Sequence, residues 1–572
     1  MMMVSESGDM PAILRDVIIT ILYKGKGPRD NCDSYRGISL MSHKGKLLER
    51  LILNRLKPAL KELIPAHQFG FTEKCGTQDA ILVSRLLGID ATKRHTGLVR
   101  GYIDLTKAYD KVNRELLWKI LRLYGIPEEM VVVIIAFHEA ARAVLQLEGE
   151  ISPTVISLNR GLKQGSVLSP IMFNIFFGVM SNEFEKRCVA QTTKDIILGV
   201  RVQYNLDNGF MDDTQIHRRK PGMRTATVID VLYADDCVIF ANTIRAMQLM
   251  MVAFDEVATL FGMEVAITKT KVVCNNYSKA MEFEAREAER QVVVTPQYNT
   301  RGSQELARLQ VNDVTLFVPV VLIRGEKLEV VPYFRYLGLL DKDDGALGVE
   351  IQARICRMKQ RFKEFEGRVF CNTEVSTLPR MQVCKCMVLT NGMYAAEVWN
   401  YTRADMDRLE KHYFRLLRST LFMLKYGTTY LAVLNLARTQ GVIKIHPIES
   451  YVQRQQLKFL WKILHLEDTA LQRIVLHGKL DPQYCQGRGG RQRTFKQCIK
   501  EALANFGVTM VQCMAMAQQD WDAVIEGIGM DTAAQQWEAR PKASKPIDIE
   551  WRTRREHGLG RRKMHTLPEA IA

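Results

Sequence analysis

Two adjacent aspartates, Asp235 and Asp236, interrupt an apolar run that extends from residue 231 to residue 240. The flanking residues are mostly β-branched, aromatic or aliphatic and favour strands, whereas Ala-Asp-Asp is typical of a turn. The pattern therefore predicts a β-hairpin with two acids at its tip. Neighbouring carboxylates repel each other, and a divalent cation with oxygen ligands, such as Mg²⁺, would offset that charge. The alternative is a solvated acidic turn, which is common in proteins.

The composition narrows the class of protein. A chain of 572 residues is too long to fold around a single hydrophobic core. At about 100–200 residues per domain, three or four units are expected. The net charge of +16 indicates a polyanionic partner. Twelve cysteines without a C-x-x-C pair or a signal peptide favour reduced thiols in a nuclear or cytoplasmic protein. The most apolar window, 130–147, is too short to span a membrane and is expected to be a buried helix, so no membrane partner is predicted.

A second acid, Asp104, follows the strand-like run 98–103. Beyond it, Asn113 is expected to cap a helix that Gly125 ends. A glycine-bearing loop, 159–170, precedes an apolar helix and can approach a phosphate or a base closely. Acids that converge from separate strands are what two-metal phosphoryl transfer requires. Asp104 together with the hairpin tip therefore predicts a catalytic metal site.

Four segments in a fixed order carry a family resemblance. They are IDLTKAYD at 103–110, GLKQGSVLSP at 161–170, YADD at 233–236 and FRYLG at 334–338. Together they resemble the reverse transcriptase of LINE-type non-LTR retrotransposons over roughly residues 11 to 430. The resemblance implies an α+β right-hand polymerase fold with fingers, a palm built on an antiparallel sheet, a helical thumb and a mostly helical C-terminal region.

The resemblance also implies the domain boundaries. These are an N-terminal segment with fingers over 1–97, a palm over 98–340 with insertions near 190–225 and 276–325, a helical thumb over 345–431, and a helical basic region over 432–572. The charged tail after residue 541 has the composition of a disordered segment. The Arg/Gly-rich stretch 487–493 is expected to bind template RNA electrostatically, with a plain linker as the alternative.

By the same resemblance, Asp104 and Asp235 are the principal ligands of two Mg²⁺ ions, with Mn²⁺ as an alternative metal. Asp236 supports them, and the main-chain carbonyl of Leu105 is a further ligand. Lys269 matches a lysine that protonates pyrophosphate as a general acid, with an exposed lysine without function as the alternative.

Substrate contacts follow from the resemblance too. Tyr109 would be an aromatic gate that selects dNTPs over rNTPs, and a core tyrosine is the alternative. Gln164 and Gly165 would contact the nascent base pair and the template. Arg36 would contact the triphosphate or, alternatively, form a structural salt bridge.

The hairpin FRYLG would be the primer grip, whose residues are Phe334, Tyr336, Leu337 and Gly338.

Two departures from the family pattern affect these expectations. Thr72 stands where the family usually has arginine, which would weaken dNTP binding unless Lys74 substitutes for it. An N-terminal endonuclease and a Cys/His knuckle are missing, so we expect either a fragment of a larger polyprotein or a chain that has lost autonomous integration.

The sequence predicts an RNA-directed DNA polymerase that extends a DNA primer on an RNA template with dNTPs. One rival is a polymerase that copies RNA into RNA, and Tyr109 argues against it. The other is a degenerate, catalytically weak retroelement remnant that only binds RNA, and the intact Asp104, Asp235 and Asp236 oppose it.

Overall fold

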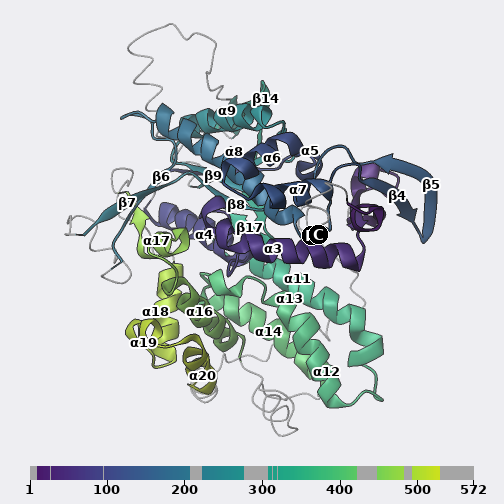
Figure 1. Cartoon of the computed structure of the whole chain (residues 1–572). Coiled ribbons are helices and arrows are strands. Elements are labelled where there is room, and N and C mark those ends of the chain that lie inside the picture. Colours follow the sequence, from purple (N-terminus) through teal and green to yellow (C-terminus); the bar gives the residue numbers. More distant parts are fainter. Residues whose placement is uncertain are drawn as a thin grey trace, which may run out of the picture. The chain divides into compact units, whose positions relative to one another are not determined.

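The computed structural model describes residues 10–25, 27–94, 96–206, 222–275, 307–311, 314–318, 320–421, 447–481 and 493–528. The chain divides into two compact units, Met1–Gly345 with Leu466–Gln492, and Ala346–His465 with Arg493–Ala572. The first unit holds every described strand together with helices, and the described part of the second is built from helices (Figure 1). The predicted α+β class is confirmed.

The described elements of the first unit are α2 (Ala12–Arg15), β1 (Val17–Tyr23), η1 (Cys32–Ser34), β2 (Tyr35–Leu40), α3 (His43–Leu63), α4 (Thr77–Arg94), β3 (Leu98–Ile103), α5 (Ala108–Lys111), α6 (Arg114–Leu123), α7 (Glu128–Ala136), β4 (Arg142–Leu147), β5 (Glu150–Ser157), α8 (Ser169–Gln191), β6 (Val200–Tyr204), β7 (Arg224–Val228), β8 (Asp230–Tyr233), β9 (Asp236–Ala241), α9 (Ile244–Leu260), β10 (Lys271–Asn275), β11 (Ala307–Val311), β12 (Val314–Val318), β13 (Leu322–Ile323), β14 (Glu326–Lys327), β15 (Glu329–Val330), β16 (Tyr333–Tyr336), β17 (Leu339–Lys342), α17 (Leu471–His477) and β18 (Lys479–Leu480).

The described elements of the second unit are α11 (Gly348–Phe365), η3 (Glu366–Phe370), α12 (Thr377–Val383), η4 (Cys384–Leu389), α13 (Thr390–Gly392), η5 (Ala396–Val398), α14 (Arg403–Thr420), α16 (Ile448–Leu464), α18 (Phe495–Asn505), α19 (Met510–Ala515) and α20 (Gln518–Ile528). Three of these helices, α14, α18 and α19, begin with a threonine capping box that satisfies free amide groups of the first turn.

A five-stranded sheet in the order β15-β10-β3-β9-β8 positions the site. Strands β8 and β9 pair antiparallel as a hairpin, which confirms the hairpin predicted around the paired aspartates. Successive residues of β3 point to opposite faces of the sheet. Gly101 faces the methionines of α9, and a Cβ there would collide with Met251. Arg100 faces α4, where its guanidinium lies beside Gly88. The sheet is therefore covered on both faces.

Helices α8 and α9 form the centre of the core. Most residues of α8 are buried on all sides, including Phe173, Phe176 and Phe177, which is why its apolar residues show no single stripe. Phe184 of α8 meets Phe254 of α9 edge to face, with ring centroids 5.3 Å apart. The predicted apolar helix after the glycine-bearing loop lies within α8.

A second sheet has the order β2-β1-β4-β5. Its strand β4 occupies residues that were expected to continue a buried helix over 130–147, and this expectation is wrong. Helix α7 ends at Ala136, and Ala140 takes a left-handed conformation with φ of 50° before β4 begins at Arg142. The apolar window therefore spans a helix and a strand, two elements that hydrophobicity alone does not separate.

The first unit includes a segment from late in the chain. Strand β18 pairs with β6, which itself pairs with β7. Helix α17 is tied to α4 by a hydrogen bond of 3.1 Å from Gln472 Nε2 to the buried Asp79 Oδ1. The main-chain N–H of Leu480 donates to Asp90 Oδ2 at 2.7 Å. The residue pattern of 466–481 does not indicate that this segment packs in the first unit.

No described helix combines the length and the apolar character needed to cross a bilayer. Of the predicted Arg/Gly-rich stretch, residues 487–492 lie outside the described residues, and so do the tail beyond residue 528, residues 207–221 of the first predicted insertion and most of the second.

Candidate active site

The two-residue connection between β8 and β9, Ala234 and Asp235, is named the catalytic turn after the role that the sequence predicts for its acids. Ala234 has a φ of 55°, an unfavourable conformation for a residue with a side chain. The buried amide of Gln68 holds the turn, because its Oε1 accepts from Ala234 N at 2.9 Å and its Nε2 donates to Ala234 O at 3.2 Å. Gln68 Oε1 also accepts from Gly70 N at 2.8 Å. The Gln68 side chain therefore binds both the N–H and the C=O of Ala234, the residue that directly precedes the paired acids.

Gly70 lies directly against the same turn. A Cβ on Gly70 would overlap the main-chain nitrogen of Ala234 and would lie 2.9 Å from the carbonyl carbon of Tyr233. The main-chain oxygen of Gly70 accepts from Asn174 Nδ2 at 2.6 Å, which fixes the segment to α8. From the sequence, this segment was considered only for Thr72 and its effect on dNTP binding, and the support that it gives to the catalytic turn was missed. The glycine in Gln-Phe-Gly-Phe was the available signal, since glycine often marks a close approach of two backbones.

Asp104 follows β3 directly and comes beside the hairpin tip. The register pairs Ile103 with Cys237, so the next residues along the two strands are Asp104 and Asp236. The main-chain oxygen of Asp104 accepts from Ala266 N at 2.8 Å, and its main-chain nitrogen donates to Thr270 Oγ1 at 3.3 Å. These bonds fix the backbone from which the carboxylate projects.

The charges of the three acids act on one another. Burial by surrounding protein raises the pKa of Asp236 to about 7, with the charges of Asp235 and then Asp104 as the next causes. Burial also raises the pKa of Asp235, and the charge of Asp104 raises it further. Both side chains still reach solvent. Arg36 on β2 opposes these effects, since its positive charge lowers the pKa of both Asp235 and Asp236.

Lys269 is the cation nearest to Asp104 among the described ion pairs. Its Nζ lies 3.9 Å from Asp104 Oδ1, and the two side chains are 66% and 46% exposed. The predicted lysine is thus beside the predicted acid, and both remain accessible to solvent.

Tyr109 lies on α5, just after Asp104 in the chain. Its ring stacks on Phe173 of α8 with centroids 4.6 Å apart. Burial raises the pKa of its hydroxyl, and the charge of Asp235 raises it further. The ring is therefore both packed on the core and close to the catalytic turn.

The loop that carries Gln164 and Gly165 runs along β2. The main-chain oxygen of Gln164 accepts from Ser39 N at 2.7 Å, and the Gln164 side chain is exposed. Gly165 has a φ of +119°, and a Cβ there would lie 2.6 Å from the main-chain oxygen of Ser39. Glu49 of α3 holds the far end of the loop, because its Oε2 accepts from Val167 N at 2.7 Å.

The predicted primer-grip residues form the hairpin of β16 and β17. Leu337 and Gly338 both have positive φ, 47° and 87°, as a two-residue hairpin turn requires. Phe334 and Tyr336 pack on Tyr102 of β3, with ring centroids 4.4 Å and 5.4 Å away.

Asp341 of β17 joins this hairpin to the central sheet. The carboxylate is buried and pairs with Arg100 of β3 and with Arg85 of α4, and it accepts from the hydroxyl of Tyr102 at 3.1 Å. Arg100 and then Arg85 hold the pKa of Asp341 below its usual range despite its burial. The hairpin is thus anchored to β3, the strand that Asp104 follows.

Thr72 does not offer the cation that the family pattern places there. Its hydroxyl donates to the main-chain oxygen of Gln68 at 2.7 Å, inside its own loop. Lys74 is exposed and has a φ of 60°.

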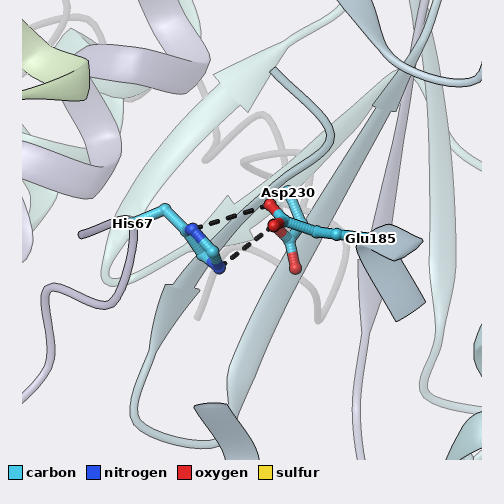
Figure 2. Close-up of side chains that lie close together, drawn as sticks. All are labelled: His67, Glu185 and Asp230. Atoms are coloured by element: carbon cyan, nitrogen blue, oxygen red, sulfur yellow. Dashed lines mark ion pairs between the residues drawn. The ribbon is translucent and has the colours of Figure 1, made fainter. Parts of the chain in front are cut away.

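Another cluster of side chains was not anticipated from the sequence. Among the described residues, the set of three metal-ligating groups whose ligand atoms lie within 4.8 Å of one another is His67, Glu185 and Asp230 (Figure 2). Asp230 begins β8, the strand that leads into the catalytic turn.

Acids that follow or begin adjacent antiparallel strands, with a cation beside them and helices behind, form the arrangement expected of a palm-type nucleotidyltransferase. The family model described as "Reverse transcriptase (RNA-dependent DNA polymerase)" matches residues 24–339. The chain belongs to this family, and the predicted right-hand polymerase fold is confirmed by it.

Curated relatives agree with the predicted non-LTR resemblance. The "RNA-directed DNA polymerase from mobile element jockey" of Drosophila melanogaster is 33% identical over 39% of this chain and 23% of its own length. The "Probable RNA-directed DNA polymerase from transposon BS" of the same species is 33% identical over 28% of this chain and 17% of its own length. The matched part is therefore less than a quarter of either relative.

Among solved structures, telomerase from Candida albicans in complex with a fragment of telomeric RNA aligns at 11% identity. The alignment covers 91% of this chain and 67% of that chain with a TM-score of 0.36, so the two do not superpose closely.

Proposed function

We propose that this chain is an RNA-directed DNA polymerase of a retrotransposon, which adds deoxynucleotides to the 3′-hydroxyl of a DNA primer on an RNA template. The observation that carries the proposal is the meeting of Asp104, Asp235 and Asp236 at one end of the adjacent strands β3 and β9. Membership of the reverse transcriptase family supports the same reaction.

The donor set suits divalent metal ions, which this family generally uses. All three side chains offer hard oxygen atoms, and burial together with the charges of the neighbouring acids raises the pKa of Asp235 and of Asp236, so a cation there would be favourable. We infer two Mg²⁺ ions, with Mn²⁺ as an alternative, held by Asp104 and Asp235 with support from Asp236 and the carbonyl of Leu105. When bound, such ions activate the primer hydroxyl and stabilise the leaving pyrophosphate.

The surrounding residues bind and orient the substrates. Tyr109 is near enough to Asp235 for the charge of that acid to raise the pKa of its hydroxyl, and its ring would exclude a 2′-hydroxyl from the sugar position. Arg36 places positive charge near the acids, where a triphosphate would lie. Lys269, 3.9 Å from Asp104, would donate a proton to the leaving pyrophosphate. Gln164 and Gly165 extend along β2 and would contact the nascent pair.

The predicted division into fingers (1–97), palm (98–340) and thumb (345–431) stays a proposal, as does the primer-grip role of the β16–β17 hairpin. The net charge of +16 supports binding of an RNA template through its phosphates. The described cysteines are free thiols, which suits a nuclear or cytoplasmic compartment.

Primer extension tests the proposal. Purified chain with poly(rA)/oligo(dT), dTTP and Mg²⁺ should extend the primer, and Asp235→Ala should reduce extension to background. Asp195→Ala, which removes an exposed aspartate of the same unit, is the matched control and should extend normally. Binding of the RNA–DNA duplex should be retained in all three proteins and should weaken with salt. If wild type and Asp235→Ala bind equally and neither extends, the chain is an RNA-binding remnant.

A further inference from the structure

His67, Glu185 and Asp230 come from three separate parts of the first unit. His67 lies in the segment between α3 and α4, Glu185 on α8, and Asp230 at the start of β8 (Figure 2). His67 Nδ1 lies 3.7 Å from Glu185 Oε1, and His67 Nε2 lies 3.4 Å from Asp230 Oδ1. The cluster is therefore assembled by tertiary structure, at the opposite end of β8 from the catalytic turn.

Among the described residues, the basic side chain that the ion pairs place beside these two carboxylates is the imidazole of His67. Asp230 is fully buried, and no lysine or arginine among the described residues forms an ion pair with it or with Glu185. Burial raises the pKa of Asp230 to about 7 and also raises that of Glu185, while it lowers the pKa of His67. A neutral imidazole between two acids leaves negative charge that a cation or a proton must compensate.

The two carboxylate oxygens of Asp230 differ in their hydrogen bonding. Asp230 Oδ2 accepts the hydroxyl hydrogen of Ser181 at 2.6 Å. Asp230 Oδ1 is buried, has no hydrogen-bond donor of its own and lies 3.4 Å from His67 Nε2, while the Asp230 and Glu185 carboxyl groups are within hydrogen-bonding reach of each other. An unused buried carboxylate oxygen costs free energy unless a ligand occupies it.

The hydrogen atoms fix the orientation of the imidazole lone pair. When Asp230 and Glu185 are both ionised, Ser181 gives its one hydroxyl hydrogen to Asp230, and its Oγ then accepts from His67 Nε2, which lies 3.2 Å away. With the proton on Nε2, Nδ1 carries a lone pair that faces Glu185 Oε1 across 3.7 Å. Two acceptors thus face each other with no hydrogen between them.

A metal ion fits this gap. Bonds of about 2.1 Å to a histidine nitrogen and a carboxylate oxygen would span 3.7 Å at an angle of roughly 120°. Imidazole together with carboxylates suits zinc-type ions, whereas Mg²⁺ prefers oxygen donors alone. Glu185 is 34% exposed, which provides access from solvent and space for a bound water.

We propose that His67, Glu185 and Asp230 form a binding site for a divalent transition metal ion of zinc type, separate from the catalytic acids. The hydroxyl of Ser181 orients the Asp230 ligand. The ion would join α8, β8 and the segment whose next residues, Gln68 and Gly70, support the catalytic turn. Its role is structural, and it stabilises the backbone on which the turn rests.

The test counts zinc in a chain whose catalytic acids are disabled. The full-length Asp104→Asn/Asp235→Asn chain, freed of metal with a chelator, is titrated with Zn²⁺ and analysed by mass spectrometry of the bound metal. We expect one zinc per chain at this site. Adding Asp230→Asn or Glu185→Gln should weaken zinc binding by at least about 10–100-fold.

Glu183→Gln is the matched control, because Glu183 lies on the same helix but pairs with Arg187 at the surface. It should leave zinc binding unchanged. Co²⁺ absorption then separates nitrogen and oxygen ligands from cysteine thiolates, which give an intense near-ultraviolet band. If Asp230→Asn does not fold, Glu185→Gln at the solvent-exposed edge provides the comparison.

Two results would overturn the proposal. One is a parent chain that binds no zinc apart from thiolate-bound metal. The other is equal zinc affinity in Glu185→Gln and Glu183→Gln. In either case a proton shared between Glu185 and Asp230 compensates the buried charge. Neither result bears on primer extension, so the site stands or falls independently of the proposed polymerase activity.

Discussion

Two interpretations of Tyr109 were open from the sequence, an aromatic gate and a core tyrosine, and the structure has features of both. Its ring packs on Phe173, as a core tyrosine would, and its hydroxyl responds to the charge of Asp235, as a gate residue would. A stacked ring is a rigid obstacle, so the packing strengthens the gate assignment rather than competing with it.

Tyr109→Val should open the sugar position to a 2′-hydroxyl. With poly(rA)/oligo(dT), we expect the ratio of kcat/KM for UTP to that for dTTP to rise by roughly 10–100-fold, because a steric filter of this size has been removed. Tyr109→Phe keeps the ring and should keep the wild-type ratio. An unchanged ratio in Tyr109→Val would reject the gate assignment.

Asp236 gives a pH dependence with a definite sign. In the metal-free chain its pKa is raised from 3.8 to about 7, so its protonated form is the one that the fold favours. This group therefore contributes stability that is fully present below pH 3.8 and is lost as the pH rises through about 7. Bound Mg²⁺ should restore the stability lost at high pH.

Protons should compete with Mg²⁺ for Asp236. We expect the Mg²⁺ concentration for half-maximal primer extension to be higher at pH 6 than at pH 8, by up to about tenfold per pH unit below the pKa. Magnesium titrations at several pH values measure this. Asp236→Asn should flatten the dependence in whatever activity it retains, and a half-maximal concentration independent of pH would contradict the expectation.

The catalytic turn illustrates how one element depends on another. The strained backbone at Ala234 is supported by Gln68 and contacted by Gly70, both from a segment more than 160 residues earlier in the chain. Strain of this kind persists only where surrounding structure enforces it.

Gly70→Ala should displace the turn, because the added Cβ overlaps the backbone of Ala234. A shift of about 1 Å in the paired acids lowers activity by roughly a hundredfold, and the overpacking costs about 1–3 kcal/mol of stability. Primer extension and thermal unfolding measure the two effects. Gly367→Ala is the control, since a Cβ there meets no atom within 4 Å. Normal extension by Gly70→Ala would show that the contact is unimportant.

Local patterns explain which elements could be predicted from the sequence. The hairpin β8–β9 and helix α6, which Asn113 caps by accepting from Leu116 N, depend on neighbours in the chain, and both agree with the structure. The hydrogen bonds of Gln68 to Ala234 and the cluster around His67 depend on packing between distant segments. A single sequence does not indicate which distant residues come into contact. The prediction of one buried helix over residues 130–147 was wrong because apolar composition suits both a buried helix and a strand.

At the scale of the whole chain, contacts between distant segments are again what the sequence does not predict. Residues 466–481 follow a long stretch of the second unit, yet α17 and β18 belong to the first. Their attachment includes the pairing of β18 with β6 and the hydrogen bonds of Gln472 with Asp79 and of Leu480 with Asp90. Such contacts between segments almost 400 residues apart cannot be read from periodicity or composition.

Gln472→Ala should loosen this attachment selectively. The change removes one donor from the buried carboxylate of Asp79, which costs about 1–3 kcal/mol. We expect hydrogen exchange to accelerate in 466–481 and in α4, while α11 and α14 of the second unit keep their rates, because the two units are compact on their own. Gln191→Ala, an exposed position on α8, is the control. Parallel acceleration in both units would mean that they unfold together. Unchanged exchange in α4 would mean that the late segment does not stabilise the first unit.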